Sequence, residues 1–190
     1  MTDFRDYDIL TLPGWKGSDE DHWQTVWERA LPNVRRVEQE NWDAPDYGAW
    51  ASRLGAAVAA SERPILLVGH SLGSVLASRW LVETGGAGVA GAFLVAVSDR
   101  DRWEADPAEP QGFAPITRRR LPVPTFVLAS QDDPRVDFGR AKTFADDWRA
   151  RLIDVGALGH IGSAANLGVW PQGLVWLGQL TEVAAGGRIG

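Results

Sequence analysis

The sequence of 190 residues contains no cysteine. This absence excludes disulfide bonds, thiolate zinc sites and cysteine nucleophiles together. Long apolar runs are also absent, since none reaches the roughly 18 residues that a membrane-spanning helix needs. The acidic start MTDFRDYD lacks the apolar segment that a secretory signal requires. We therefore expect a cytoplasmic protein with no membrane partner.

Positive charge is scarce as well. Lys and Arg number 19 against 25 Asp and Glu, which gives a net charge of −6. The run Arg118-Arg119-Arg120 is short and lies beside two prolines, which is typical of a solvated loop rather than of a nucleic-acid-binding surface. We therefore expect no nucleic-acid partner.

Apolar residues make up 45% of the chain, enough for a sizeable core, and at this length we expect a single domain over residues 1–190. The apolar runs are short and alternate with helical patterns, which is typical of a parallel α/β sheet. Strands are expected at residues 8–12, 34–37, 65–68, 92–97, 125–129 and 151–155. Helices are expected at residues 21–31, 47–60, 72–83, 138–148 and 174–185, and the tail 186–190 is expected to fray. This order predicts a doubly wound, mainly parallel six-stranded sheet with helices on both faces.

The stretch ILLVGHSLGSVLAS, residues 65–78, carries a Gly-x-Ser-x-Gly pattern between a predicted strand and a predicted helix. In that context the pattern indicates a nucleophile elbow, a strained turn that exposes a serine at the edge of the sheet. We predict that Ser71 is a nucleophile, the alternative being a serine that only suits a tight turn. The Leu72 N–H, at the start of the following helix, is then placed to bind a developing oxyanion.

A serine hydroxyl is nearly inert without a base, and the chain has only three histidines. His160 follows the last predicted strand in a glycine-rich loop, at the sheet edge where such folds place their chemistry, and is the predicted base. His70 lies inside the elbow, and we expect its side chain to point away from Ser71. His22 opens a predicted helix and is expected to be a surface or capping residue.

The third member of a triad is an acid that orients the histidine, and it is expected between the serine and the histidine along the chain. Asp132 and Asp133 follow the fifth predicted strand directly, although Asp-Asp-Pro is also a good turn sequence. Asp99 and Asp101, after the fourth strand, are more distant alternatives.

The segment LTLPGWKGSDEDHW follows the first strand and suits a second oxyanion donor, because Gly14 lets the loop pass close to the elbow. The Trp15 N–H is the candidate. Neither glycine-rich phosphate-binding pattern occurs there. The residues between the fourth and fifth strands are rich in Asp, Pro and Arg and are expected to pass over the sheet. Trp103 and Phe113 in this excursion are expected at the rim of a substrate pocket.

Together these motifs resemble the small α/β-hydrolase family named after retinoblastoma-binding protein 9 and the bacterial protein YdeN. The likeness covers nearly the whole chain. The motifs that carry it are the Pro-Gly-Trp loop, the GHSLG elbow, the SQDDP segment, and Gly-His followed by LGVWP. The resemblance implies a compact fold with little or no cap domain and a Ser-Asp-His triad. The family acid is the aspartate immediately before the proline, which corresponds to Asp133.

The resemblance and the residues together predict a serine hydrolase that acts on a small ester, thioester or amide through an acyl-enzyme intermediate, with no metal and no organic cofactor. Gly162 and Asn166 depart from the family pattern outside the predicted triad. The retinoblastoma-binding motif of the human relative requires a cysteine, so that role is not expected here. The alternative is a hydrolase-fold binding or scaffold protein with little catalysis, which would not need to keep all three triad residues.

Overall fold

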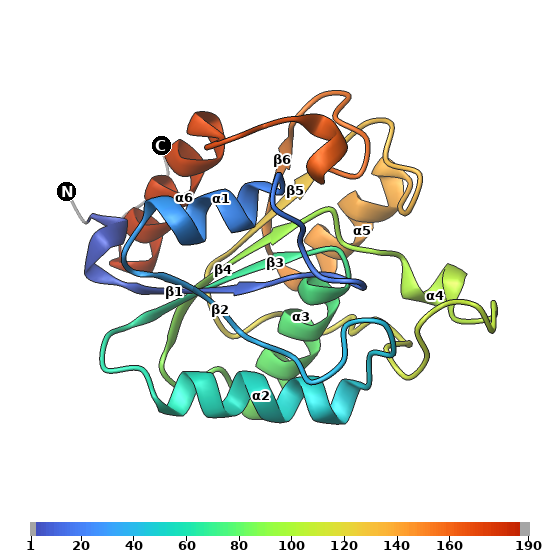
Figure 1. Cartoon of the computed structure of the whole chain (residues 1–190), viewed down its shortest axis with the longest axis horizontal. Coiled ribbons are helices and arrows are strands. Elements are labelled where there is room, and N and C mark those ends of the chain that lie inside the picture. The colour runs from blue at the N-terminus through green and yellow to red at the C-terminus, as the bar shows by residue number, and fades with distance from the viewer. Residues whose placement is uncertain (1–2, 187–190) are drawn as a thin grey trace.

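The computed structural model describes residues 3–186, and at its centre is a six-stranded sheet (Figure 1). The strands are β1 (Asp8–Leu12), β2 (Val34–Arg36), β3 (Ile65–His70), β4 (Val89–Val95), β5 (Thr125–Ala129) and β6 (Arg151–Asp154). Their order is β2-β1-β3-β4-β5-β6, and every neighbouring pair is parallel. The predicted α/β sheet is confirmed. The predicted fraying of the tail concerns residues 186–190, of which 187–190 lie outside the described residues.

The direction of winding changes between β1 and β3. The chain runs from β1 outward to β2, returns to place β3 on the other side of β1, and then adds the remaining strands in sequence order. In open sheets of this kind, ligands bind beyond the carboxyl ends of the strands at the switch point. The loop after β1 and the turn after β3 meet at that edge.

Helices cover both faces of the sheet (Figure 1). They are α1 (Trp23–Ala30), α2 (Tyr47–Ala59), α3 (Leu72–Thr84), α4 (Arg100–Trp103), α5 (Phe138–Trp148) and α6 (Pro171–Ala184), with short 3-10 turns at Phe4–Asp6 and Ser163–Ala165. Trp23, Trp27 and Leu177 of α1 and α6 pack on one face of the sheet. Side chains of α2, α3 and α5, including Trp50 and Phe144, pack on the other. Burying both faces explains the continuous apolar runs of the central strands.

Most element ends lie within two residues of the sequence-based expectation, and three features differ more. β4 begins at Val89 rather than at residue 92, because its first residues pair with the start of β3. α6 begins at Pro171 rather than at residue 174, since proline suits the first helical position, where its missing N–H costs nothing. The excursion after β4 contains the short helix α4, which the sequence pattern did not indicate.

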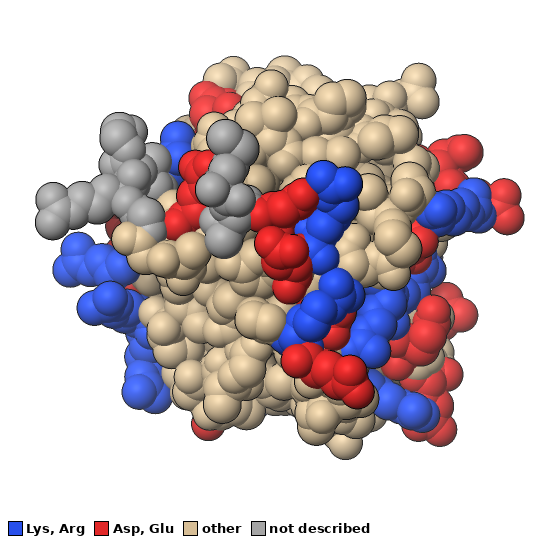
Figure 2. All heavy atoms as spheres, turned by 90° about the vertical axis from the view of Figure 1, so that its left-hand side faces the viewer, with Lys and Arg blue, Asp and Glu red and all other residues tan. Residues whose placement is uncertain are grey.

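Charged side chains of both signs lie beside one another on the face shown in Figure 2. Within residues 3–186, no helix has the length and apolar composition that crossing a bilayer requires.

Candidate active site

The elbow between β3 and α3 holds Ser71 in a strained backbone conformation, with φ 55° and ψ −117°. Few non-glycine residues adopt such a conformation, and those that do are concentrated at functional sites. The flanking glycines make the turn possible. A Cβ on Gly73 would lie 1.9 Å from the Leu12 carbonyl oxygen, and a Cβ on Gly69 would lie 2.7 Å from the Ser74 Cα. Strand, turn and helix can approach this closely only because both positions lack a side chain.

His160 connects Ser71 to Asp133. The Ser71 Oγ lies 2.8 Å from His160 Nε2, and His160 Nδ1 lies 2.9 and 3.0 Å from the two carboxylate oxygens of Asp133. The Asp133 side chain is fully buried, whereas 26% of the His160 side chain is exposed. The carboxylate partner assigns the imidazole proton to Nδ1, which leaves the Nε2 lone pair free to accept from the serine hydroxyl.

Asp132 has a different place from its neighbour. Its Oδ1 accepts from the Ser130 hydroxyl at 2.7 Å and from the Gly159 N–H at 2.8 Å. These two hydrogen bonds, that of Ser130 first, lower the pKa of Asp132. Asp132 therefore ties the loop just before His160 to the end of β5 and does not contact the imidazole.

The other acidic candidates lie elsewhere. Asp99 accepts from Arg140 Nε at 3.0 Å, and Asp101 accepts from Arg140 Nη2 at 2.6 Å and from the Ile116 N–H at 2.8 Å. Both carboxylates are occupied in holding the excursion to α5.

The two remaining histidines form a buried layer behind the site. The ring Nε2 of His70 lies 2.9 Å from the carbonyl oxygen of His160, to which it donates. The His22 ring packs edge-on against His70 at 4.6 Å between centroids, and its Nδ1 caps α1 by accepting from the Gln24 N–H. His22 is a capping residue as expected, but it is buried rather than on the surface. Burial lowers the pKa of His22 to about 4 and that of His70 well below its usual range.

One candidate oxyanion donor belongs to the elbow, and the other belongs to the loop after β1. Leu72 is the first residue of α3, and Trp15 lies in the loop after β1. A Cβ on Gly14 would come within 2.9 Å of the Ser71 Cβ, so this loop does pass against the elbow. The Trp15 indole donates to the Asp43 carbonyl at 3.0 Å, which fixes the ring. The backbone N–H groups of Trp15 and Leu72 donate none of the turn, loop and cap hydrogen bonds between backbone groups in residues 3–186.

A cavity of about 190 Å³ opens beside Ser71. Its walls are formed by Gly14, Trp15, Gly17, His70, Ser71, Leu72, Ser98, Arg100, Glu109, Pro110, Arg135 and His160. This is small beside the roughly 300–1,000 Å³ of pockets that hold drug-sized ligands. The space suits a small ligand.

The expectation for Phe113 is wrong. Its ring is fully buried between Tyr47 and Trp50, because the excursion folds down onto the core after passing the cavity. Trp103 stands behind the cavity wall rather than in it. Its indole donates to the Arg135 carbonyl at 3.0 Å, and its ring supports the Arg135 guanidinium.

Sequence reasoning missed three charged residues in the wall, Arg100, Glu109 and Arg135. Two of them could have been found by position. Arg100 follows β4 and Arg135 lies two residues after Asp133, so both lie near carboxyl ends of strands at the active edge. Glu109 gives no such signal.

Comparisons with known proteins identify the family of the chain. A family model described as serine hydrolase matches residues 9–179. The chain belongs to the serine hydrolase family. This serine hydrolase is 34% identical to a YdeN-like hydrolase of Pectobacterium atrosepticum, over 95% of this chain and 93% of that one, with a TM-score of 0.85. It shares 19% identity with the ydeN gene product of Bacillus subtilis, over 93% and 99% of the two chains, with a TM-score of 0.74. No curated protein matches it.

Proposed function

We propose that this member of the serine hydrolase family transfers the acyl group of a small ester, thioester or amide to water through Ser71. The observation that carries the proposal is the continuous contact from the Ser71 hydroxyl through the His160 imidazole to the buried Asp133 carboxylate. A serine in an elbow, a base within hydrogen-bond reach and an acid that orients the base are the parts that nucleophilic acyl transfer needs.

In the first half of the reaction, Ser71 Oγ attacks the substrate carbonyl carbon while its proton moves to His160 Nε2. The charge that develops on the carbonyl oxygen is stabilised by the N–H groups of Leu72 and Trp15. The tetrahedral intermediate then collapses, the bond to the leaving group breaks, and His160 gives its proton to that group. Asp133 holds the imidazole in the required tautomer and stabilises its charged form throughout.

In the second half, water attacks the acyl-enzyme. His160 takes a proton from the water, the oxyanion forms again between the same two N–H groups, and the carboxylic acid leaves as Ser71 recovers its proton from the imidazole. The partial exposure of His160 supports this step, since water must reach its Nε2.

The test is hydrolysis of p-nitrophenyl butyrate by the wild-type chain and by Ser71→Ala. We expect kcat to fall by at least about 10³-fold in the variant, in line with the loss of a triad nucleophile. Ser78→Ala is the matched control, because Ser78 is a buried serine of α3, the helix that follows Ser71, and its hydroxyl donates back to the Val75 carbonyl at 2.9 Å. Activity that survives in Ser71→Ala at the level of the control would refute the proposal.

A further inference from the structure

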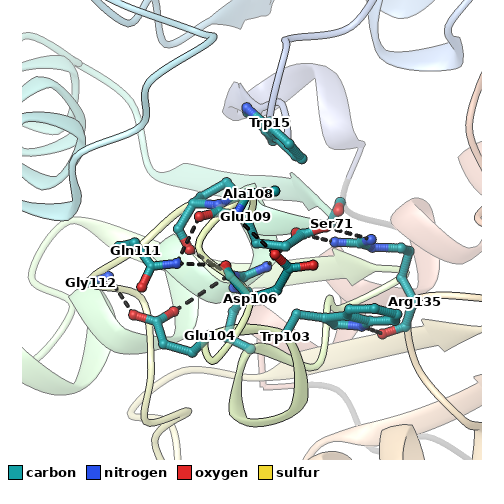
Figure 3. A network of polar contacts seen from close by, with 12 residues as sticks. Trp15, Ser71, Trp103, Glu104, Asp106, Ala108, Glu109, Gln111, Gly112 and Arg135 are labelled. Atoms are coloured by element: carbon teal, nitrogen blue, oxygen red, sulfur yellow. Dashed lines mark hydrogen bonds and ion pairs between the residues drawn. The ribbon is translucent and has the colours of Figure 1, made fainter.

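Part of the cavity wall is a cluster of ionised side chains that the triad mechanism does not use. It consists of Arg100, Glu109 and Arg135, and we call it the Arg-Glu-Arg cluster. Glu109 links the two arginines. Its carboxylate accepts from both terminal nitrogens of Arg135, with Oε1 3.0 Å from Nη1, and its Oε2 accepts from Arg100 Nη1 at 3.1 Å. Figure 3 shows the paired Arg135 and Glu109 side chains close to Ser71, with Trp15 nearby.

The cluster has more positive than negative charge at the cavity. Two guanidinium groups face one carboxylate among the lining residues. Burial alone would raise the pKa of Glu109, but the hydrogen bonds from Arg135 and Arg100 outweigh that effect and lower it, so the carboxylate is ionised. Glu104 contacts Arg100 only at 3.5 Å, does not line the cavity, and accepts the Gly112 N–H with its other oxygen.

Arg100 is almost completely buried, with 1% of its side chain exposed. One of its terminal nitrogens donates to the Pro110 carbonyl, and its Nε–H has no partner among the residues that the structure describes. A buried donor without a partner is costly, and each such group in a native protein needs an explanation. The positive charge of Arg100 lies in the wall of the cavity and favours an anion there, although the side chain itself is too buried to be the direct contact.

Arg135 is held in place before any ligand arrives. Its backbone N–H donates to Asp133 Oδ1 at 2.8 Å, so the turn that positions the triad acid also positions this side chain. Its guanidinium lies 4.5 Å from the centre of the Trp103 ring, and 26% of the side chain is exposed. A fixed, partly exposed guanidinium loses little entropy when it binds a carboxylate.

We propose that the Arg-Glu-Arg cluster is a specificity site for a carboxylate, so that the preferred substrate is an ester, thioester or amide of a small molecule bearing a second, free carboxyl group. The inference rests on the proposed function, since it names the substrate class of the same site. The small volume of the cavity limits the distance between the scissile carbonyl and the carboxylate to a few bonds. Arg135, the more exposed of the two, makes the direct contact, and the buried Arg100 adds its charge from the same wall.

The test compares methyl esters that have the same shape and different charge. Monomethyl glutarate carries a carboxylate, methyl 5-methylhexanoate a neutral isopropyl group, and methyl 4-(trimethylammonio)butanoate a cation at the corresponding position. A second set carries the same three end groups on the alcohol, with acetate as the acyl part. We expect kcat/KM for the anionic ester to exceed that of its neutral partner by about 10- to 100-fold in one of the sets, the usual size of a charge-assisted contact.

Two variants separate recognition from damage to the fold. Arg135→Gln should abolish the preference for the anion, whereas Glu109→Gln should increase it, because the second change removes the competing carboxylate. The ratio of the two esters is measured on one enzyme sample, so a smaller folded fraction cancels from it. Arg102→Gln is the control, since Arg102 lies on α4 but is 54% exposed and outside the cavity wall, and its ratio should match that of the wild type.

The outcomes distinguish the two proposals. Hydrolysis of the neutral or the cationic ester at least as fast as the anionic one in both sets overturns the carboxylate site and leaves the serine hydrolase mechanism standing. No hydrolysis and no labelling of Ser71 by a fluorophosphonate overturns both. If Ser71 is labelled but no ester turns over, glutarate must slow the labelling more than neutral glutaramide does, and equal effects overturn the carboxylate site.

Discussion

Replacing Asp133 by asparagine keeps the shape of the side chain and removes its charge. In the structure, Oδ1 of Asp133 accepts both from His160 Nδ1 at 2.9 Å and from the Arg135 N–H at 2.8 Å, and Oδ2 lies 3.0 Å from the same imidazole nitrogen. An asparagine can keep one oxygen at the first position only by placing its NH₂ group at the second. Two donors then face each other, and the imidazole is driven away from the tautomer that can accept the serine proton.

The magnitude follows from the burial of this carboxylate, whose side chain is fully inaccessible to solvent. Water cannot replace the lost acceptor or stabilise the imidazolium. The same substitution in a serine protease triad lowers kcat by roughly 10⁴-fold. His160 is partly exposed here and can turn toward solvent, so we expect a loss in kcat/KM on the order of 10² to 10⁴, about 3–5 kcal/mol in the barrier.

Asp132→Asn is the matched control, with the same chemical change one residue earlier. The amide oxygen of the variant can still accept from Ser130 and Gly159, and the side chain is exposed, so we expect less than about a tenfold loss. The assay is kcat/KM on p-nitrophenyl butyrate for both variants, with thermal midpoints measured in parallel. Equal losses at unchanged midpoints would refute the assignment of Asp133, and a larger loss at Asp132 would reverse it.

Two further predictions concern stability. His22 has a pKa of about 4 in the folded protein and about 6.5 when unfolded, so below pH 6.5 the unfolded chain takes up a proton first and stability falls toward pH 4. His22→Asn retains a capping side chain that does not titrate. Between pH 7 and pH 4, the free energy of unfolding in urea should therefore fall by about 3 kcal/mol less in the variant than in the wild type. An equal fall in both proteins would contradict this prediction. Gly73→Ala should prevent normal folding, because its Cβ would overlap the Leu12 carbonyl, whereas Gly139→Ala, with open space around it in α5, should change the midpoint little. A folded Gly73→Ala variant of wild-type stability would show that the elbow geometry is wrong.

Much of the fold could be predicted from the sequence because its signals lie within short stretches of the chain. The continuous apolar run of β3 and the glycines around Ser71 specify a buried strand and a tight turn without reference to the rest of the chain. His160 could be chosen by its place after β6. Asp133 could not be separated from Asp132 by its local sequence alone, and the choice depended on the family resemblance.

The cavity wall could not be predicted from the sequence, because its residues are far apart along the chain and come into contact only in the folded protein. Arg100 and Glu109 belong to the excursion after β4, which includes α4, and Arg135 belongs to the segment after β5, so their pairing depends on how the excursion folds back. The error at Phe113 has the same origin. An aromatic residue in a polar loop can either line a pocket or pack into the core. The contact between Phe113 and Trp50 shows that Phe113 packs into the core.

The most direct test of the central claim is the site of reaction with a fluorophosphonate. The full chain is treated with the probe at neutral pH, and the adduct is located by peptide mass spectrometry. Ser71 is the one serine that combines the elbow conformation with an imidazole at 2.8 Å in the part of the chain that the structure describes, so we predict a single stoichiometric adduct on Ser71 that His160→Ala abolishes. An adduct on Ser98 or Ser130, or no adduct at all, would contradict the account.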